Sequence, residues 1–197
     1  MTAFKFCPRC ATSLTDRECA EDGGPTLRLA CPAHACGFVH YDNPTPAVGV
    51  LLEQDGEIIM ARGANWPEGF FALITGFLER NEDPIKGVIR EVKEETNLDV
   101  IETNIIGNYI YDRKNEVMLC YHAIVTGEIK LSPELIETKR YQPHELRPWP
   151  RATGFAVADW MKSRGLEVKF IDRPLIDRKS TRLNSSHPRL SRMPSSA

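Results

Sequence analysis

The stretch GFLERNEDPIKGVIREVKEETNL, residues 76–98, is the most informative part of this chain. Asp83 is a helix-capping residue type and Pro84 suits the first helical position, so a helix is predicted to begin there. Asn97 tolerates the left-handed conformation and is predicted to end the helix. Apolar residues recur between them at intervals of three and four, which favours one apolar helix face: Ile85, Val88, Ile89 and Val92.

Three glutamates crowd the end of this predicted helix. At about 100° per residue, Glu91 and Glu95 stack one turn apart on the flank of the apolar face, and Glu94 lies on a more exposed side. Neighbouring carboxylates repel each other unless a cation neutralises them, and hard divalent cations bind carboxylate oxygens. The spacing therefore indicates a divalent-cation site, with a solvated acidic helix face as the alternative.

The wider spacing of the stretch resembles the signature of the Nudix hydrolases, GX5EX7REUXEEXGU, where U is aliphatic. The defined positions are filled here by Gly76, Glu82, Arg90, Glu91, Glu94 and Glu95. Only the last glycine differs, and Asn97 in its place keeps the left-handed backbone, so activity is expected to survive. The flanking sequence is similar to a bacterial Nudix subgroup, NADH pyrophosphatase-like, that carries a zinc ribbon.

The resemblance implies an α/β fold, the Nudix α/β/α sandwich with a mixed sheet. It implies metal-dependent hydrolysis of the pyrophosphate bond in a nucleoside diphosphate linked to another moiety, such as NAD(H) or ADP-ribose. Mg²⁺ or Mn²⁺ is the implied cofactor. Its implied ligands are Glu91, Glu94, Glu95 and the carbonyl of Gly76, with Glu82 supporting the loop or binding a further metal through water. Arg90 would hold a glutamate in position, and Glu94 or Glu95 would act as the general base.

The first forty residues contain two cysteine clusters whose spacing is typical of a zinc ribbon. Thiolates two residues apart surround one tetrahedral Zn²⁺, and a second pair completes the site. The expected ligands are Cys7, Cys10, Cys31 and Cys36. His34 is the open alternative to Cys36, and Cys19 is expected in an acidic loop. Because so short a segment cannot build an apolar core, structural Zn²⁺ is expected to supply its folding energy.

The Nudix domain is expected over residues 41–170, after a zinc ribbon over residues 1–40. Apolar runs and turn signals predict strands at 47–53, 58–62, 70–74, 117–125 and 127–131. Thr153 is predicted to cap a last helix that ends at Gly165.

Substrate-binding residues lie outside the signature. Tyr109, Tyr111 and Arg113 are candidates to stack on a base or pair with a phosphate, and alternation along a sheet edge explains them equally well. Trp66 and Phe70 are candidates for a pocket wall, although core packing is favoured for large aromatics. The SQPWPFPxS pattern of the NAD(H)-hydrolysing relatives is absent, so the ribbon does not establish NAD(H) as substrate. Two further acids could add a metal ligand but are better explained as solvated: Glu134 and Glu137.

The composition, 42% hydrophobic over 197 residues, suits one domain with a small appendage. No apolar run approaches the roughly 20 residues that span a bilayer. The N-terminus lacks the apolar core of a secretory signal, so a cytoplasmic protein without membrane contact is expected. Five of the six cysteines fall within the first 36 residues, which favours metal binding over disulfides.

The expected partner is a small-molecule nucleotide substrate. Neither the net charge of −2 nor the N-terminal segment, which has no basic patch, predicts nucleic acid. A homodimer is compatible with the resemblance, but no sequence feature demonstrates it. The alternative function is a non-catalytic Nudix nucleotide sensor, or a ribbon that binds nucleic acid or protein.

The last stretch, residues 177–197, resembles a translated DNA sequencing adapter rather than native protein. A natural basic, serine-rich tail without a fixed structure is the alternative. Without its five basic residues and one acid, the net charge changes from −2 to −6. The excess acid then lies in the part of the chain that carries the predicted cation site.

Overall fold

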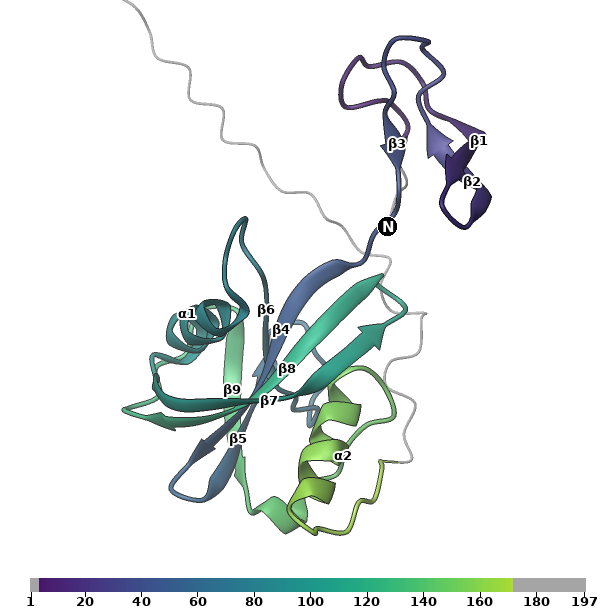
Figure 1. Cartoon of the computed structure of the whole chain (residues 1–197). Coiled ribbons are helices and arrows are strands. Elements are labelled where there is room, and N and C mark those ends of the chain that lie inside the picture. The colour runs from purple at the N-terminus through teal and green to yellow at the C-terminus, as the bar shows by residue number, and fades with distance from the viewer. Residues whose placement is uncertain (1–3, 172–197) are drawn as a thin grey trace, which may run out of the picture.

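The computed structural model describes residues 4–171 of the chain, in which two sheets and two α-helices are formed (Figure 1). The suspected adapter-derived segment, 177–197, lies outside the described residues. A small three-stranded sheet comes first and a six-stranded sheet follows it. No helix within residues 4–171 has both the length and the apolar character needed to cross a membrane.

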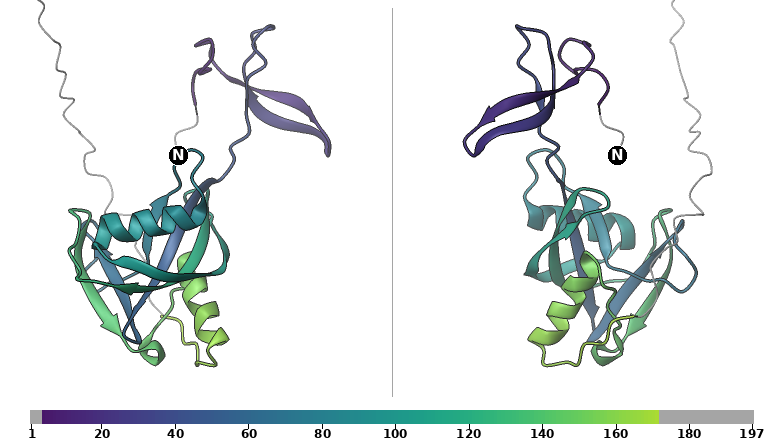
Figure 2. Two further views of the ribbon diagram at one scale, coloured as in Figure 1. Left: turned by 60° about the vertical axis from the view of Figure 1, so that its left-hand side comes forward. Right: turned by 90° about the vertical axis from the view of Figure 1, so that its right-hand side faces the viewer.

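The N-terminal sheet is antiparallel and is built from β1 (Thr15–Glu21), β2 (Gly24–Ala30) and β3 (Val39–His40). Its first two strands form a hairpin that projects away from the larger sheet (Figure 2). The expectation that Cys19 lies in a loop is wrong, because Cys19 pairs with Thr26 across this hairpin. The charged residues around Cys19 face water on an exposed strand, and this gives them the composition of a loop.

The larger sheet has the strand order β7-β8-β4-β5-β9, with β6 paired to β4. Its strands are β4 (Thr45–Gln54), β5 (Glu57–Gly63), β6 (Ile74–Phe77), β7 (Asp99–Tyr111), β8 (Glu116–Thr126) and β9 (Leu135–Tyr141). The pair β4 and β8 is parallel and the other pairs are antiparallel. This is the mixed sheet that the resemblance implied.

The two helices, α1 (Pro84–Thr96) and α2 (Thr153–Ser163), cover opposite faces of this sheet (Figure 2). Alternating residues of β4 show the arrangement directly. Val48 and Val50 belong to the core that contains Val88 of α1, whereas Leu51 belongs to the core that contains Val157 of α2. A strand covered on both faces is apolar without interruption, as β4 is at its centre. The predicted α/β/α sandwich is confirmed.

Helix α1 begins and ends where the sequence predicts. The Asp83 carboxylate accepts a hydrogen bond of 2.9 Å from the backbone N–H of Ile85, and Asn97 adopts a φ of 64°. The predicted apolar face is only half right. Val88 is buried, but Ile85 and Ile89 are 45% and 46% exposed. The buried face is rotated toward Gly87, Glu91 and Thr96, so the glutamate flank of the helix faces into the fold.

Three other expectations about elements are wrong. Residues 127–131 form no strand, because Gly127 turns the chain with a φ of 108°. The antiparallel partner of β8 is instead β7, which the sequence did not reveal. Within 70–74 only Ile74 belongs to strand β6, and Phe70 and Phe71 precede it. Thr153 is the first residue of α2 rather than its cap, since Ala152 holds the cap position with a φ of 40° and no side-chain hydrogen bond.

Candidate active site and zinc site

The carboxylates of α1 open onto a hollow of about 400 Å³ between α1, β6 and the segment before β9. We call it the carboxylate hollow. Its acidic lining includes Glu91, Glu94, Glu95, Glu116 and Glu134. Gly76 of β6 lies against this set, and a Cβ at that position would overlap the Glu91 carboxyl group. The glycine therefore lets the β6 backbone reach the acidic side chains.

Arg90 organises the acids around it. Its Nε and Nη2 each donate a hydrogen bond of 2.8 Å to the Glu82 carboxylate, and Nη2 also donates to the Phe77 carbonyl. Its Nη1 donates to Glu91 at 2.7 Å and to Glu94 at 3.1 Å. The bonds from Arg90, with one from the Glu79 backbone N–H, lower the pKa of Glu82 to about 2. Arg90 thus joins the loop before α1 to the glutamates of the helix.

Glu95 differs from its neighbours because Arg90 forms no hydrogen bond or ion pair with it in the described structure. Burial, together with the charges of Glu91, Glu134 and Glu94, raises the pKa of Glu95 to about 7. The hollow therefore holds negative charge that residues 4–171 do not compensate. Such a site favours a bound cation.

The donor set fits a hard divalent cation, since it consists of carboxylate and carbonyl oxygens. It does not discriminate between Mg²⁺ and Mn²⁺. The carboxylate oxygens of this set do not converge on one cation position, because Arg90 forms hydrogen bonds with those of Glu91 and Glu94. Among the described residues only the four cysteines form a group whose ligand atoms all lie within 4.8 Å of one another.

The N-terminal cysteines form that group. The Sγ atoms of Cys7 and Cys36 are 3.5 Å apart, those of Cys10 and Cys31 are 3.5 Å apart, and those of Cys10 and Cys36 are 3.6 Å apart. Zn–S bonds of about 2.3 Å in a tetrahedron place sulfurs about 3.8 Å apart, so the group fits Zn²⁺. His34 is exposed and is not part of the group. The geometry therefore favours Cys36 over His34.

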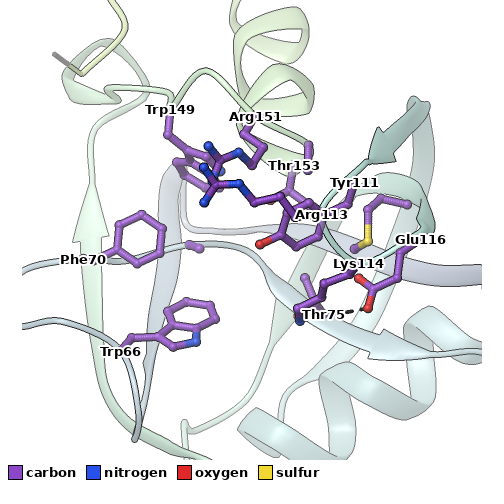
Figure 3. A pocket seen from close by; sticks show the side chains of 13 residues that line it. Trp66, Phe70, Thr75, Tyr111, Arg113, Lys114, Glu116, Trp149, Arg151 and Thr153 are labelled. Atoms are coloured by element: carbon purple, nitrogen blue, oxygen red, sulfur yellow. Dashed lines mark ion pairs between the residues drawn. The ribbon is translucent and has the colours of Figure 1, made fainter. Parts of the chain in front are cut away.

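A second hollow, of about 390 Å³, is drawn in Figure 3. We call it the aromatic hollow, because Trp66, Phe70 and Trp149 form one wall of it. The rings of Trp66 and Phe70 are 5.4 Å apart between centroids, and those of Phe70 and Trp149 are 5.6 Å apart. The charged side chains in its lining are Arg113, Lys114, Glu116 and Arg151. The two hollows are contiguous, because both are lined by Thr75, Lys114, Glu116 and Met118.

The structure separates the predicted substrate-binding residues. Tyr111 and Arg113 line the aromatic hollow. Tyr109 does not, and its hydroxyl donates a hydrogen bond of 2.9 Å to Asp159 of α2. This bond gives Tyr109 a structural partner, so its proposed contact with substrate loses support.

Of the other candidates outside the signature, two aromatic residues and one of two acids line a hollow. Trp66 and Phe70, for which core packing was favoured, are half-buried and line the aromatic hollow. Glu134 lines the carboxylate hollow, whereas Glu137 pairs with Arg62 at 2.8 Å.

Sequence reasoning missed Lys114, Glu116, Trp149 and Arg151 as site residues. Trp149 stands between two prolines, and a large aromatic residue in so rigid a segment was the available signal. The others had no local signal, because tertiary packing alone brings their segments together.

A mixed sheet between two helices, with a glutamate-rich helix beside a glycine of the preceding strand, defines a Nudix-type fold and site. The family model for the NUDIX domain matches residues 43–160, and the chain belongs to this family.

Curated relatives include proteins named NAD-capped RNA hydrolase NudC. That of Stutzerimonas stutzeri is 30% identical over 142 residues, which cover 72% of this chain and 49% of the relative. That of Pseudomonas aeruginosa strain LESB58 is 30% identical over 138 residues, covering 70% and 47%. The chain thus spans about half the length of the curated relatives it matches.

Solved structures agree on the fold. A NUDIX hydrolase from Nitrosomonas europaea superimposes with a TM-score of 0.67 and 25% identity, over 85% of this chain and 99% of that one. A MutT protein from Methanosarcina mazei gives a TM-score of 0.52 and 20% identity, over 65% and 100%. At that identity the second match shows the fold alone.

Proposed function

We propose that this protein is a metal-dependent pyrophosphohydrolase that cleaves a nucleoside diphosphate linked to another moiety. The observation that carries the proposal is the contiguity of the aromatic and carboxylate hollows. An aromatic wall suits a base, since every base has a face on which to stack. An oxygen-donor site suits the cation that accompanies a diphosphate. A substrate that fills both hollows has its base and its diphosphate joined, as in a nucleotide.

The substrate crosses between the hollows at Thr75 and Lys114. With the base among the aromatic rings, the diphosphate passes these two side chains, and the Lys114 ammonium offsets part of its charge. The cation-binding set is Glu91, Glu94, Glu95 and the Gly76 carbonyl, with Glu134 as an additional ligand. When bound there, Mg²⁺ or Mn²⁺ supplies positive charge against the phosphate oxygens and makes water more acidic.

Proton transfer falls to a glutamate that is not engaged by Arg90. Of the two candidates, Glu94 is bound by Arg90 and Glu95 is not, so we assign the general base to Glu95. A water oxygen forms a bond to one phosphorus and its proton passes to Glu95. The bond from that phosphorus to the bridging oxygen breaks, and the electron pair leaves with the other phosphate. Arg90 and Glu82 hold the loop and helix in place and do not contact the reacting atoms.

The remaining parts of the proposal concern the zinc ribbon, the location and oligomeric state of the protein, and its partners. We infer that Cys7, Cys10, Cys31 and Cys36 bind one structural Zn²⁺. Cytoplasmic location, a homodimer and the domain bounds of 1–40 and 41–170 remain predictions. The expectation against nucleic acid is not kept as an exclusion, because the relatives are named for a capped RNA. NAD(H) and NAD-linked RNA therefore enter the substrate panel.

The test is hydrolysis of a nucleotide panel by the Glu94→Gln and Glu95→Gln variants. The panel contains NADH, ADP-ribose, a nucleotide sugar, a dinucleoside polyphosphate and NAD-capped RNA, each with Mg²⁺ or Mn²⁺ and phosphatase coupling. We expect wild-type turnover of at least one substrate and its loss in Glu95→Gln. The matched control is Glu137→Gln, which removes an acid that pairs with Arg62 outside the hollow. Full activity in both signature variants would refute the assignment, whereas binding of a panel nucleotide without turnover by the wild-type protein would favour a nucleotide sensor.

A further inference from the structure

Two arginines in the aromatic hollow have no role in the proposed chemistry. Arg113 lies in the turn between β7 and β8, and Arg151 lies in the turn before α2, yet both side chains point into the hollow (Figure 3). We propose that they bind a third phosphate, one esterified to the ribose of the nucleoside that occupies the hollow. This inference rests on the proposed function and specifies its substrate class: nucleotides with a phosphate beyond the scissile diphosphate.

The position of the arginines separates them from the scissile bond. Lys114 lines both hollows, so it is placed to meet the diphosphate. Arg113 and Arg151 line the aromatic hollow and are absent from the lining of the carboxylate hollow. A phosphate that meets them therefore lies at the nucleoside end of the substrate.

The charge balance of the hollow points to an anion. Neither Arg113 nor Arg151 forms a side-chain ion pair or hydrogen bond with any residue in the described part of the chain. The one acid in the lining, Glu116, lies 4.0 Å from Lys114. Two guanidinium groups that share a hollow whose one lining acid lies beside Lys114 repel each other, and an anion between them removes this repulsion. Guanidinium groups match phosphate oxygens in geometry as well as charge.

The turn that carries Arg151 is fixed by the fold. The Arg151 backbone N–H donates to the Trp149 carbonyl at 2.8 Å, and the Arg151 carbonyl accepts from Gly154 at 2.8 Å. A Cβ on Gly154 would overlap the Trp149 carbonyl, so the turn has no room to relax. Trp149 itself is buried. The guanidinium therefore extends from a rigid base beside the aromatic wall, where a ribose would follow a stacked base.

The first experiment compares kcat/KM for NADPH and NADH, which differ by one ribose 2′-phosphate. We expect kcat/KM of the wild-type protein to be about tenfold or more higher for NADPH than for NADH. A charge-assisted hydrogen bond to the extra phosphate supplies enough free energy for this ratio. Arg151→Gln and Arg113→Gln should bring the ratio toward one, and Arg151→Lys should retain part of it. Rising salt should lower the ratio. The matched control is Arg147→Gln on the same loop, which removes an exposed arginine bonded to the carbonyls of His144 and Leu146 and should leave the ratio unchanged.

A third substrate identifies the source of the phosphate. NAD joined through its adenosine 3′ oxygen to one further nucleotide carries a phosphodiester in place of the monoester. Preference for this substrate alone assigns the arginines to a nucleic-acid chain, and preference for NADPH assigns them to a free nucleotide. Turnover of NADH with a ratio near one for both phosphate-bearing substrates would overturn the inference and leave the proposed function standing.

A binding measurement keeps the inference testable without turnover. Calorimetry compares adenosine 2′,5′-bisphosphate and adenosine 3′,5′-bisphosphate with AMP, all on the full chain. At least one bisphosphate should bind about tenfold more tightly than AMP in wild type, and the gain should vanish in Arg151→Gln. Equal affinity for all three would overturn the inference. Absence of hydrolysis with an intact bisphosphate preference would instead overturn the proposed function alone.

Discussion

The carboxylate hollow and the aromatic hollow share four lining residues but arise from the sequence in different ways. Three glutamates of the first, Glu91, Glu94 and Glu95, come from a single stretch of 23 residues, and one helix sets their mutual spacing. Glu116 and Glu134 join them from other segments. The second collects side chains from the segment before β6, the β7–β8 turn and the turn before α2. Reaction chemistry is thus encoded locally in this fold, and substrate choice is encoded by segments that meet only after folding.

The largest expected effect comes from Gly76→Ala, which tests whether the carboxylate hollow still works when β6 is displaced from α1. Its Cβ would overlap the Glu91 carboxyl group, so β6 or α1 must shift. Misplaced catalytic groups cost on the order of 100-fold in rate, and such overpacking costs about 1–3 kcal/mol of stability. Steady-state kinetics and urea unfolding measure the two losses.

The matched control for this change is Gly23→Ala, whose added Cβ meets nothing within 4 Å. It should leave the rate intact and stability within about 0.5 kcal/mol. If Gly76→Ala behaves like Gly23→Ala, close approach of β6 to Glu91 is not needed for activity.

A smaller effect is expected from Trp66→Leu, which tests whether the aromatic hollow binds the base of the substrate. Trp66 is half-buried and packs against Phe70 at the edge of the hollow. Base stacking on an aromatic side chain is worth about 1–3 kcal/mol, so KM should rise roughly tenfold while kcat changes little. Initial-rate kinetics on the best substrate of the panel give both constants. A fall in kcat with KM unchanged would place Trp66 in the reaction step instead of base binding.

The smallest effect is a dependence of stability on pH. It arises from Glu95, which lines the carboxylate hollow and not the aromatic hollow. Burial and neighbouring carboxylates raise the pKa of Glu95 from its ordinary value of 4.5 to about 7. The folded state then binds a proton more tightly than the unfolded state, so stability contributed by protonated Glu95 is lost as pH rises from 4.5 to 7. Without added divalent cation, Tm should fall across this window, and Mg²⁺ should raise Tm more at pH 8 than at pH 5.

The Glu95→Gln variant checks the source of this dependence. It removes the titrating group, so the fall in Tm between pH 4.5 and 7 should become shallower. The response to Mg²⁺ should also lose its pH dependence. An unchanged Tm profile in Glu95→Gln would attribute the fall to another group whose pKa is raised on folding. Buried His122 is not such a group, because burial lowers its pKa and so makes stability rise with pH.

The sequence predicted elements well where local chemistry determines them. Asp83 and Asn97 mark the two ends of α1 because capping depends on one residue and its immediate neighbours. Strand β7 escaped prediction, since register shifts after Val100 and after Ile105 interrupt its alternation. Ala152 replaces a capping side chain with backbone geometry, which leaves no sequence signal.

The same distinction holds for the candidate site. Spacing alone was enough to stack Glu91 and Glu95, because a helix converts sequence separation into direction. Gly76 was added by the resemblance to the Nudix signature. No spacing rule joins Trp66, Arg113 and Arg151, whose proximity depends on the whole β-sheet being formed. Tyr109 shows the same distinction, since its aromatic character suggested a ligand contact, whereas no local pattern indicated its hydrogen bond to Asp159 of α2.

Arg90 gives the cation site a property that its ligands alone would not have. Its guanidinium bonds Glu82, Glu91 and Glu94, so one positive charge within the protein offsets part of the charge of three acids. If a cation binds at this helix as proposed, it would replace Arg90 as the partner of some carboxylate oxygens, while the two hydrogen bonds from Arg90 to Glu82 could remain. Arg90 thus supplies positive charge to these glutamates in the structure itself, without a bound metal ion.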